Sequence, residues 1–90
     1  MGCKVKGKGN DVKEIWEDFY GNLWFVTEDE GNGNKFGYVR LHNMPDCAEW
    51  GCFNMDYIKS EIGEHKVWQV TKCNWLNVNT YEEGLLVEVD

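Results

Sequence analysis

The sequence predicts an α+β fold, with an antiparallel sheet of four to five strands and one short helix packed on it. Short segments rich in aromatic and β-branched residues alternate with turns that contain glycine and asparagine, a pattern typical of strands and hairpins. One segment, after residue 54, has helical spacing with capping residues at both ends. The chain has 90 residues, 42% of them hydrophobic, which is enough for one hydrophobic core but not for two.

The first ten residues, MGCKVKGKGN, are polar and include Lys4, Lys6 and Lys8. We expect residues 1–10 to be a flexible or edge-strand N-terminus and residues 11–90 to form a single α+β domain. This terminus lacks the apolar run of a signal peptide, and the other apolar runs are too short to cross a bilayer. We therefore expect a cytoplasmic protein with reduced cysteines and no membrane contact.

Residues 11–19, DVKEIWEDF, fit two kinds of element. As a helix, the segment would begin at an N-cap, Asp11, and bury one apolar face. That face would consist of Val12, Ile15, Trp16 and Phe19. As a strand, residues 12–16 would run into an irregular turn over residues 18–22. The spacing alone slightly favours the helix.

Two strands are predicted next, LWFVTE at Leu23 to Glu28 and FGYVRL at Phe36 to Leu41. The segment at residues 27–37, TEDEGNGNKFG, joins them and suits either a hairpin turn or a calcium loop, since both use Gly, Asn and acidic residues. In the twelve-residue calcium pattern with Gly33 sixth, Glu28 would stand where Asp is needed and Val39 where a bidentate Glu is needed. We therefore predict a hairpin.

The helix is predicted over Met55 to Ile62, with Asn54 as its N-cap and Gly63 at its C-terminus. A loop at residues 42–46, which contains the only proline, and the segment EWGCF precede it.

Two more strands are predicted after the helix. Lys66 to Lys72, KVWQVTK, alternates apolar and polar residues, and Leu85 to Val89, LLVEV, follows an acidic turn. Trp75, Leu76 and Val78 lie between them and fit a further strand.

Three stretches occur in order along the chain: VKEIWEDFYGNLWFVTE at Val12 to Glu28, FGYV at Phe36 to Val39, and EWGCFNMDYIKS at Glu49 to Ser60. In this order the chain resembles a small uncharacterised family, a domain of unknown function common on plasmids, phages and other mobile elements. The resemblance implies a mobile-element origin and a strand, rather than a helix, over Val12 to Trp16. It implies no activity and no catalytic residue. On this basis we prefer the strand for residues 12–16.

The charge is strongly negative. The net charge is −7, and because three of the nine basic residues lie in the first ten positions, residues 9–90 carry six bases and sixteen acids, a net charge of −10. This balance argues against direct binding to DNA or RNA, whose phosphates are met by clustered Lys and Arg. It favours a basic protein partner, or imitation of nucleic acid by the protein itself.

We therefore predict a non-enzymatic acidic protein-binding module with no cofactor. One form of this function is an accessory or counter-defence protein of a phage or plasmid that binds a basic nucleic-acid-handling host protein. The contact would be made by acidic loops with a tryptophan anchor. The predicted partner-binding residues are Glu17, Asp18, Glu28, Asp29, Glu30, Asp46, Glu49 and Trp50.

The sequence also fits two alternatives. A zinc-stabilised structural module would use His42, Cys47, Cys52 and Cys73, although the spacing lacks the short knuckle of most structural zinc sites. A lipid-anchored adaptor would be acylated at Gly2 and Cys3, although Lys6 stands where the acylation pattern has Ser or Thr. No feature activates a cysteine or a paired carboxylate for catalysis, so no catalytic residue is predicted.

Overall fold

The computed structural model describes residues 3–6, 10–71, 73–75 and 85–89, with side chains described for 11–44, 46–71 and 73–75. Eight strands, one α-helix and two 3-10 turns are found in this part of the chain, and the second 3-10 turn spans residues 73–75. In order they are β1 (Cys3–Lys6), β2 (Asn10–Asp11), β3 (Glu14–Asp18), β4 (Leu23–Gly31), β5 (Asn34–Leu41), β6 (Met44–Asn54), α1 (Met55–Ile62), the 3-10 turn η1 (Glu64–Lys66), β7 (Val67–Gln69) and β8 (Leu85–Val89).

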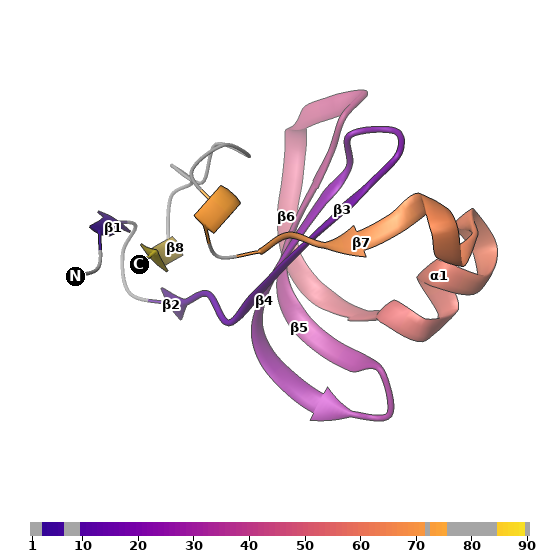
Figure 1. Cartoon of the computed structure of the whole chain (residues 1–90), viewed down its shortest axis with the longest axis horizontal. Coiled ribbons are helices and arrows are strands. Elements are labelled where there is room, and N and C mark those ends of the chain that lie inside the picture. Colours follow the sequence, from indigo (N-terminus) through magenta and orange to yellow (C-terminus); the bar gives the residue numbers. More distant parts are fainter. Residues whose placement is uncertain (1–2, 7–9, 72, 76–84, 90) are drawn as a thin grey trace.

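The main sheet is antiparallel throughout and has five strands in the order β6-β5-β4-β3-β7. Helix α1 packs on one face, and a second, three-stranded sheet of order β1-β8-β2 lies on the other side (Figure 1). The α+β fold with a five-stranded sheet and one short helix is confirmed. The second sheet was not predicted from the sequence.

The segment after β2 is a strand and not a helix. Ile15 pairs with Phe25 and Trp16 with Trp24, so these consecutive side chains enter opposite faces of the sheet. Because both faces of the sheet are covered, apolar residues occur on both sides of β3 and imitate helical spacing. Phe19, which the helix would have buried, is 72% exposed.

The β4–β5 hairpin is confirmed, and its strands are longer than predicted. They are joined by Asn32 and Gly33, which have φ values of 56° and 81°, as a two-residue type I′ turn requires. Since the strands run up to this turn, no loop of calcium-binding length exists there.

The predicted loop over residues 42–46 was wrong. Only His42 and Asn43 form the turn, and β6 already begins at Met44. Pro45 misled the prediction, because proline is excluded from central strands but is tolerated in an edge strand such as β6. The pairing of β6 with β5 is irregular at this end, between Val39 and Leu41, and regular from Glu49 to Asn54.

Helix α1 has the predicted bounds and caps. The side chain of Asn54 accepts a hydrogen bond from the backbone N–H of Tyr57 at 2.8 Å, and Gly63, with φ of 115°, donates to the carbonyl of Lys59. Met55 is buried in a cluster with Trp24 and Val67 of the sheet, against which the other apolar residues of the helix pack. Those residues are Ile58 and Ile62.

Strand β7 is shorter than the predicted strand over 66–72. It ends at Gln69, and the N–H of Val70 then donates to the carbonyl of Ile15 at 2.7 Å, which turns the Val70 side chain into the core. Residues 73–75 form a 3-10 turn in place of the predicted further strand, and Leu76 and Val78 lie outside the described residues.

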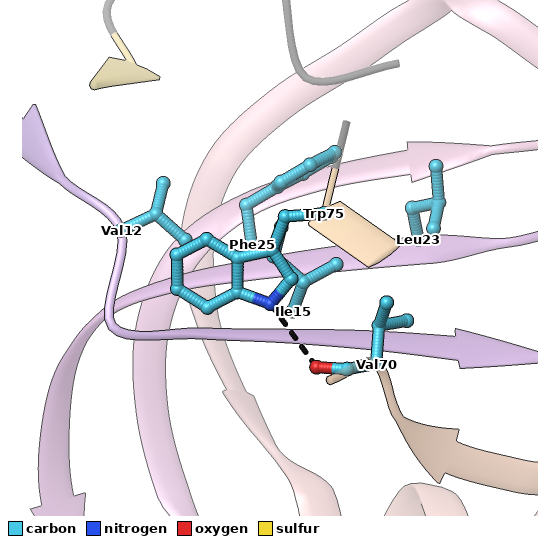
Figure 2. Close-up of a cluster of buried hydrophobic side chains, with 6 residues drawn as sticks. All are labelled: Val12, Ile15, Leu23, Phe25, Val70 and Trp75. Carbon is cyan, nitrogen blue, oxygen red and sulfur yellow. Dashed lines mark hydrogen bonds between the residues drawn. The ribbon is translucent and has the colours of Figure 1, made fainter. Parts of the chain in front are cut away.

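Trp75 closes the core on the face opposite α1. It is 2% exposed, and its indole N–H donates to the carbonyl of Val70 at 3.0 Å while the ring lies over Ile15 and Phe25 (Figure 2). The whole cluster consists of Val12, Ile15, Leu23, Phe25, Val70 and Trp75. Beyond it, β8 has the predicted bounds and pairs antiparallel with β1 and parallel with β2.

Candidate protein-binding surface

Three exposed acidic residues lie on the β4–β5 hairpin or beside its turn, namely Glu28, Glu30 and Asp56, and we call them the acidic tip. Asp56 belongs to the first turn of α1, yet its carboxylate lies where a Cβ on Gly33 would stand. The backbone holds these parts together, because the N–H of Met55 donates to the carbonyl of Gly33 at 2.8 Å. The helix therefore adds to the tip a charge, that of Asp56, which was not among the residues predicted from the sequence.

Asp29, between the other two predicted acids of this hairpin, has a structural partner. Its carboxylate lies 3.1 Å from the ammonium of Lys35, which is also 3.2 Å from the carboxylate of Glu14. A hydrogen bond from the backbone of Gly31, and then the hydrogen bond and charge of Lys35, lower the pKa of Asp29. Desolvation lowers the pKa of Lys35, but its bonds to Asp29 and Glu14 outweigh that effect and raise it. Asp29 therefore stays ionised and has an ion-pair partner within the protein.

Strand β6 carries two further predicted residues, Asp46 and Glu49, and both are exposed. Trp50 follows and is half-buried. Its ring stacks on Phe36 with centroids 6.0 Å apart and meets the edge of Tyr38 at 5.4 Å. These contacts hold the indole in place while part of it stays accessible, which is what a binding anchor needs.

The C-terminal end of β6 lies beside the hairpin turn, and we call β6 and the acidic tip together the acidic border. The side-chain nitrogen of Asn54, the last residue of β6, donates to Asn34 at 2.8 Å and to the carbonyl of Asn32 at 3.2 Å, so β6 ends beside the hairpin turn. Asp46 and Glu49 belong to β6, and Asp56, two residues after its end, lies beside Gly33 of the turn.

Glu17 and Asp18 lie apart from this border. They end β3, which is separated from β6 by two strands, at the end of the sheet opposite the hairpin tip. Asp18 is 2% exposed and accepts hydrogen bonds from the backbone of Tyr20 and Asn22 and from the side chain of Asn22. The expectation that Asp18 faces a partner was wrong, because the carboxylate is consumed in closing the β3–β4 turn.

No basic side chain in the described part of the chain forms an ion pair with the acids of this border. In the part of the chain with described side chains, the ion pairs are those of Lys35, and Lys59 lies 4.4 Å over the ring of Trp16. Glu28, Glu30, Asp46, Glu49 and Asp56 therefore have no ion-pair partner among the described residues.

The residues of the zinc alternative do not converge. Cys47, Cys52 and Cys73 are exposed free thiols, and His42 lies against Gly21 in the turns at the far end of the sheet. Among the described residues, no group of three or more His, Cys, Asp or Glu side chains could hold a metal ion. The lipid-anchor alternative falls on Gly2 and on the side chain of Cys3, which lie outside the described part.

Comparisons with protein families, with curated proteins and with solved structures found no match to this chain. The resemblance to a mobile-element family therefore stays a prediction. Within the residues described, no helix has the length and apolarity needed to span a membrane.

Proposed function

We propose that this protein is a non-enzymatic binding module that engages a basic surface of another protein through the acidic tip and β6. The proposal rests on the observation that the carboxylates fall into two groups. Asp18 and Asp29 are satisfied within the fold, whereas those along β6 and at the tip are exposed and unpaired among the described residues.

A border of this kind acts in two ways. Unpaired carboxylates attract a basic partner over a distance of about one Debye length, roughly 8 Å at physiological ionic strength, and so raise the association rate. Trp50 then supplies apolar contact area that excludes water from the interface once the two surfaces meet. A protein that holds nucleic acid would present a suitable basic groove, and it could be blocked by these carboxylates.

Charge reversal at the tip tests the proposal. The double variant Glu28→Lys with Glu30→Lys changes two exposed acids and leaves the Asp29–Lys35 ion pair intact. The matched control is Glu61→Lys with Glu64→Lys, which makes the same charge change at the far end of α1 and in η1. The wild-type protein and both variants would be used to capture partners from cells of the native host at low and physiological salt.

We expect the wild-type protein and the control to retain a basic protein at low salt and to release much of it at physiological salt. The tip variant should retain little of it at either. Equal capture by all three proteins, or capture that is indifferent to salt, would overturn the proposal. Circular dichroism of each variant verifies that the fold has been kept.

A further inference from the structure

Strand β6 is an open edge of the main sheet. Among the described residues it pairs only with β5. In an antiparallel pair, residues alternate between those that bond to the neighbouring strand and those whose N–H and C=O point away from it. The N–H of Met55 bonds to the carbonyl of Gly33 on the β5 side. Counting back along β6 in steps of two, the N–H and C=O groups that point toward β5 are those of Phe53, Gly51 and Glu49.

The N–H and C=O groups of Trp50 and Cys52 therefore point outward, away from β5. No backbone hydrogen bond joins either N–H to another described segment. The open part of the edge is as regular as a sheet interior, because the register from Glu49 to Asn54 contains no bulge. Such an edge can accept one more strand.

A small cavity of about 200 Å³ lies beside this edge. Its lining includes two apolar residues of β5, Val39 and Leu41, and one acidic residue, Glu49. Gly51 adds no side chain, and a Cβ there would have no atom within 4 Å. A lining that combines apolar residues with an acidic one matches the side chain of lysine or arginine, whose methylene groups prefer apolar contact while the charged end seeks an acid.

The charge of β6 indicates which kind of strand would pair with it. Strand β6 contains Asp46 and Glu49 and has no basic residue. Two copies of β6 would bring like charges together, whereas a strand with basic side chains would meet opposite ones. We propose that β6 receives an extended basic segment of the partner protein as an added antiparallel strand, with one Lys or Arg side chain in the cavity beside Glu49.

This inference rests on the proposed function and names how the partner binds. The partner strand forms main-chain hydrogen bonds with Trp50 and Cys52, and its alternate residues face the cavity on one side and the Trp50 ring on the other. The main-chain bonds supply affinity, and the cavity supplies the preference for a basic side chain.

Amide hydrogen exchange followed by NMR tests the strand addition directly. The probe is a capped seven-residue peptide of alternating threonine and lysine, and the control peptide has glutamate in place of lysine. In the free protein we expect the Trp50 and Cys52 amides to exchange quickly and the Gly51 and Phe53 amides slowly. The lysine peptide should slow exchange at Trp50 and Cys52 by at least about tenfold, as a new main-chain hydrogen bond requires.

Two variants test separately the contributions of the cavity and of the β6 backbone to peptide binding. Gly51→Val fills the cavity without a clash at its Cβ, and Cys52→Pro removes one outward N–H without removing an inward bond. Each should weaken binding of the lysine peptide by about tenfold, the effect of one lost main-chain bond or of one displaced side chain. The control Glu64→Gln, remote from β6, should bind as wild type does.

The outcomes are distinct from those of the capture experiment. If the lysine peptide fails to bind, or binds without protecting Trp50 and Cys52, the strand addition is overturned even where the tip variant still loses its native partner. If the two amides become protected with rising protein concentration alone, the edge serves a second copy of this chain and the proposal is equally wrong. If, in the capture experiment, binding of the native partner does not depend on salt, the proposed function itself is overturned.

Discussion

The carboxylate of Asp18 accepts hydrogen bonds from both the backbone and the side-chain nitrogen of Asn22, each at 2.8 Å. With a third bond from the N–H of Tyr20, the buried side chain closes the turn between β3 and β4. Asp18→Ala would leave these donors without their acceptor. We expect it to lower the free energy of unfolding by about 1–3 kcal/mol, measured by denaturant titration at neutral pH.

The neighbouring acid provides the control for this prediction. Glu17→Ala removes the same charge from the next position, but no described hydrogen bond or ion pair involves its side chain, so the change should stay within about 0.5 kcal/mol. Equal effects of the two substitutions would mean that charge, and not the hydrogen bonds of the turn, determines the loss.

Lys35 joins Asp29 of the hairpin to Glu14 of β3 from a buried position. Lys35→Met keeps most of the apolar stem but leaves the partly buried carboxylate of Glu14 without its charged partner. We expect a loss of about 1–3 kcal/mol in the free energy of unfolding at pH 7. The matched control is Lys66→Met, which replaces an exposed lysine for which no described ion pair is found.

The stability difference between Lys35→Met and the wild type should depend on pH in a defined direction. Because the pKa of Asp29 is lowered from 3.8, its contribution is present above pH 3.8 and is lost as pH falls through the folded-state value. Because the pKa of Lys35 is raised from 10.5, its contribution is present below pH 10.5 and is lost as pH rises through the folded-state value. The free energies of unfolding of the wild type and of Lys35→Met should therefore converge at both low and high pH. A constant difference across the whole pH range would exclude this ion pair as the cause.

The elements that follow from local chemistry were predicted well. Helix α1 was located to the residue because its N-cap and its C-terminal glycine act within one turn of the chain. A strand from Leu23 and a hairpin after it followed from β-branched and aromatic residues and from the Gly and Asn residues of the turn, although β4 extends three residues beyond the predicted end and the turn is shorter than predicted. By contrast, the start of β6 was missed because Pro45 is acceptable only at a sheet edge, and edge position depends on the strand order of the whole sheet.

The candidate surface was predicted in part, for the same reason. The sequence identified Glu28, Glu30, Asp46 and Glu49 by charge, but could not place Asp56 beside Gly33, since a hairpin turn and a helix start must first meet in space. The sequence also could not show that Asp18 is buried, since an acid before a turn is either solvated or hydrogen-bonded to the turn. Burial and hydrogen bonding in the folded chain, not composition, divide these carboxylates into structural and exposed ones.

Gly37 and Gly51 face each other across β5 and β6, but only one of them is required by packing. A Cβ on Gly37 would collide with the carbonyl group of Phe25 on β4, whereas a Cβ on Gly51 would meet nothing within 4 Å. Gly37→Ala should therefore lower the free energy of unfolding by about 3 kcal/mol or more, because a backbone cannot yield as a side chain does. Gly51→Ala should be tolerated. Thermal unfolding of the two variants decides this, and similar melting temperatures would show that β4 and β5 do not approach so closely.

Trp75 and Trp68 come from neighbouring parts of the chain and differ in what surrounds them. Trp75 is 2% exposed and donates its indole N–H to the carbonyl of Val70, whereas Trp68 is 41% exposed. Trp75→Phe removes that donor, leaves a buried carbonyl without this bond and opens a small void, for which we expect a loss of about 1–3 kcal/mol in the free energy of unfolding. Trp68→Phe should change it by less than about 0.5 kcal/mol. Denaturant unfolding of both variants measures the difference, and a Trp75→Phe protein as stable as Trp68→Phe would mean that residues 73–75 do not seal this face of the sheet.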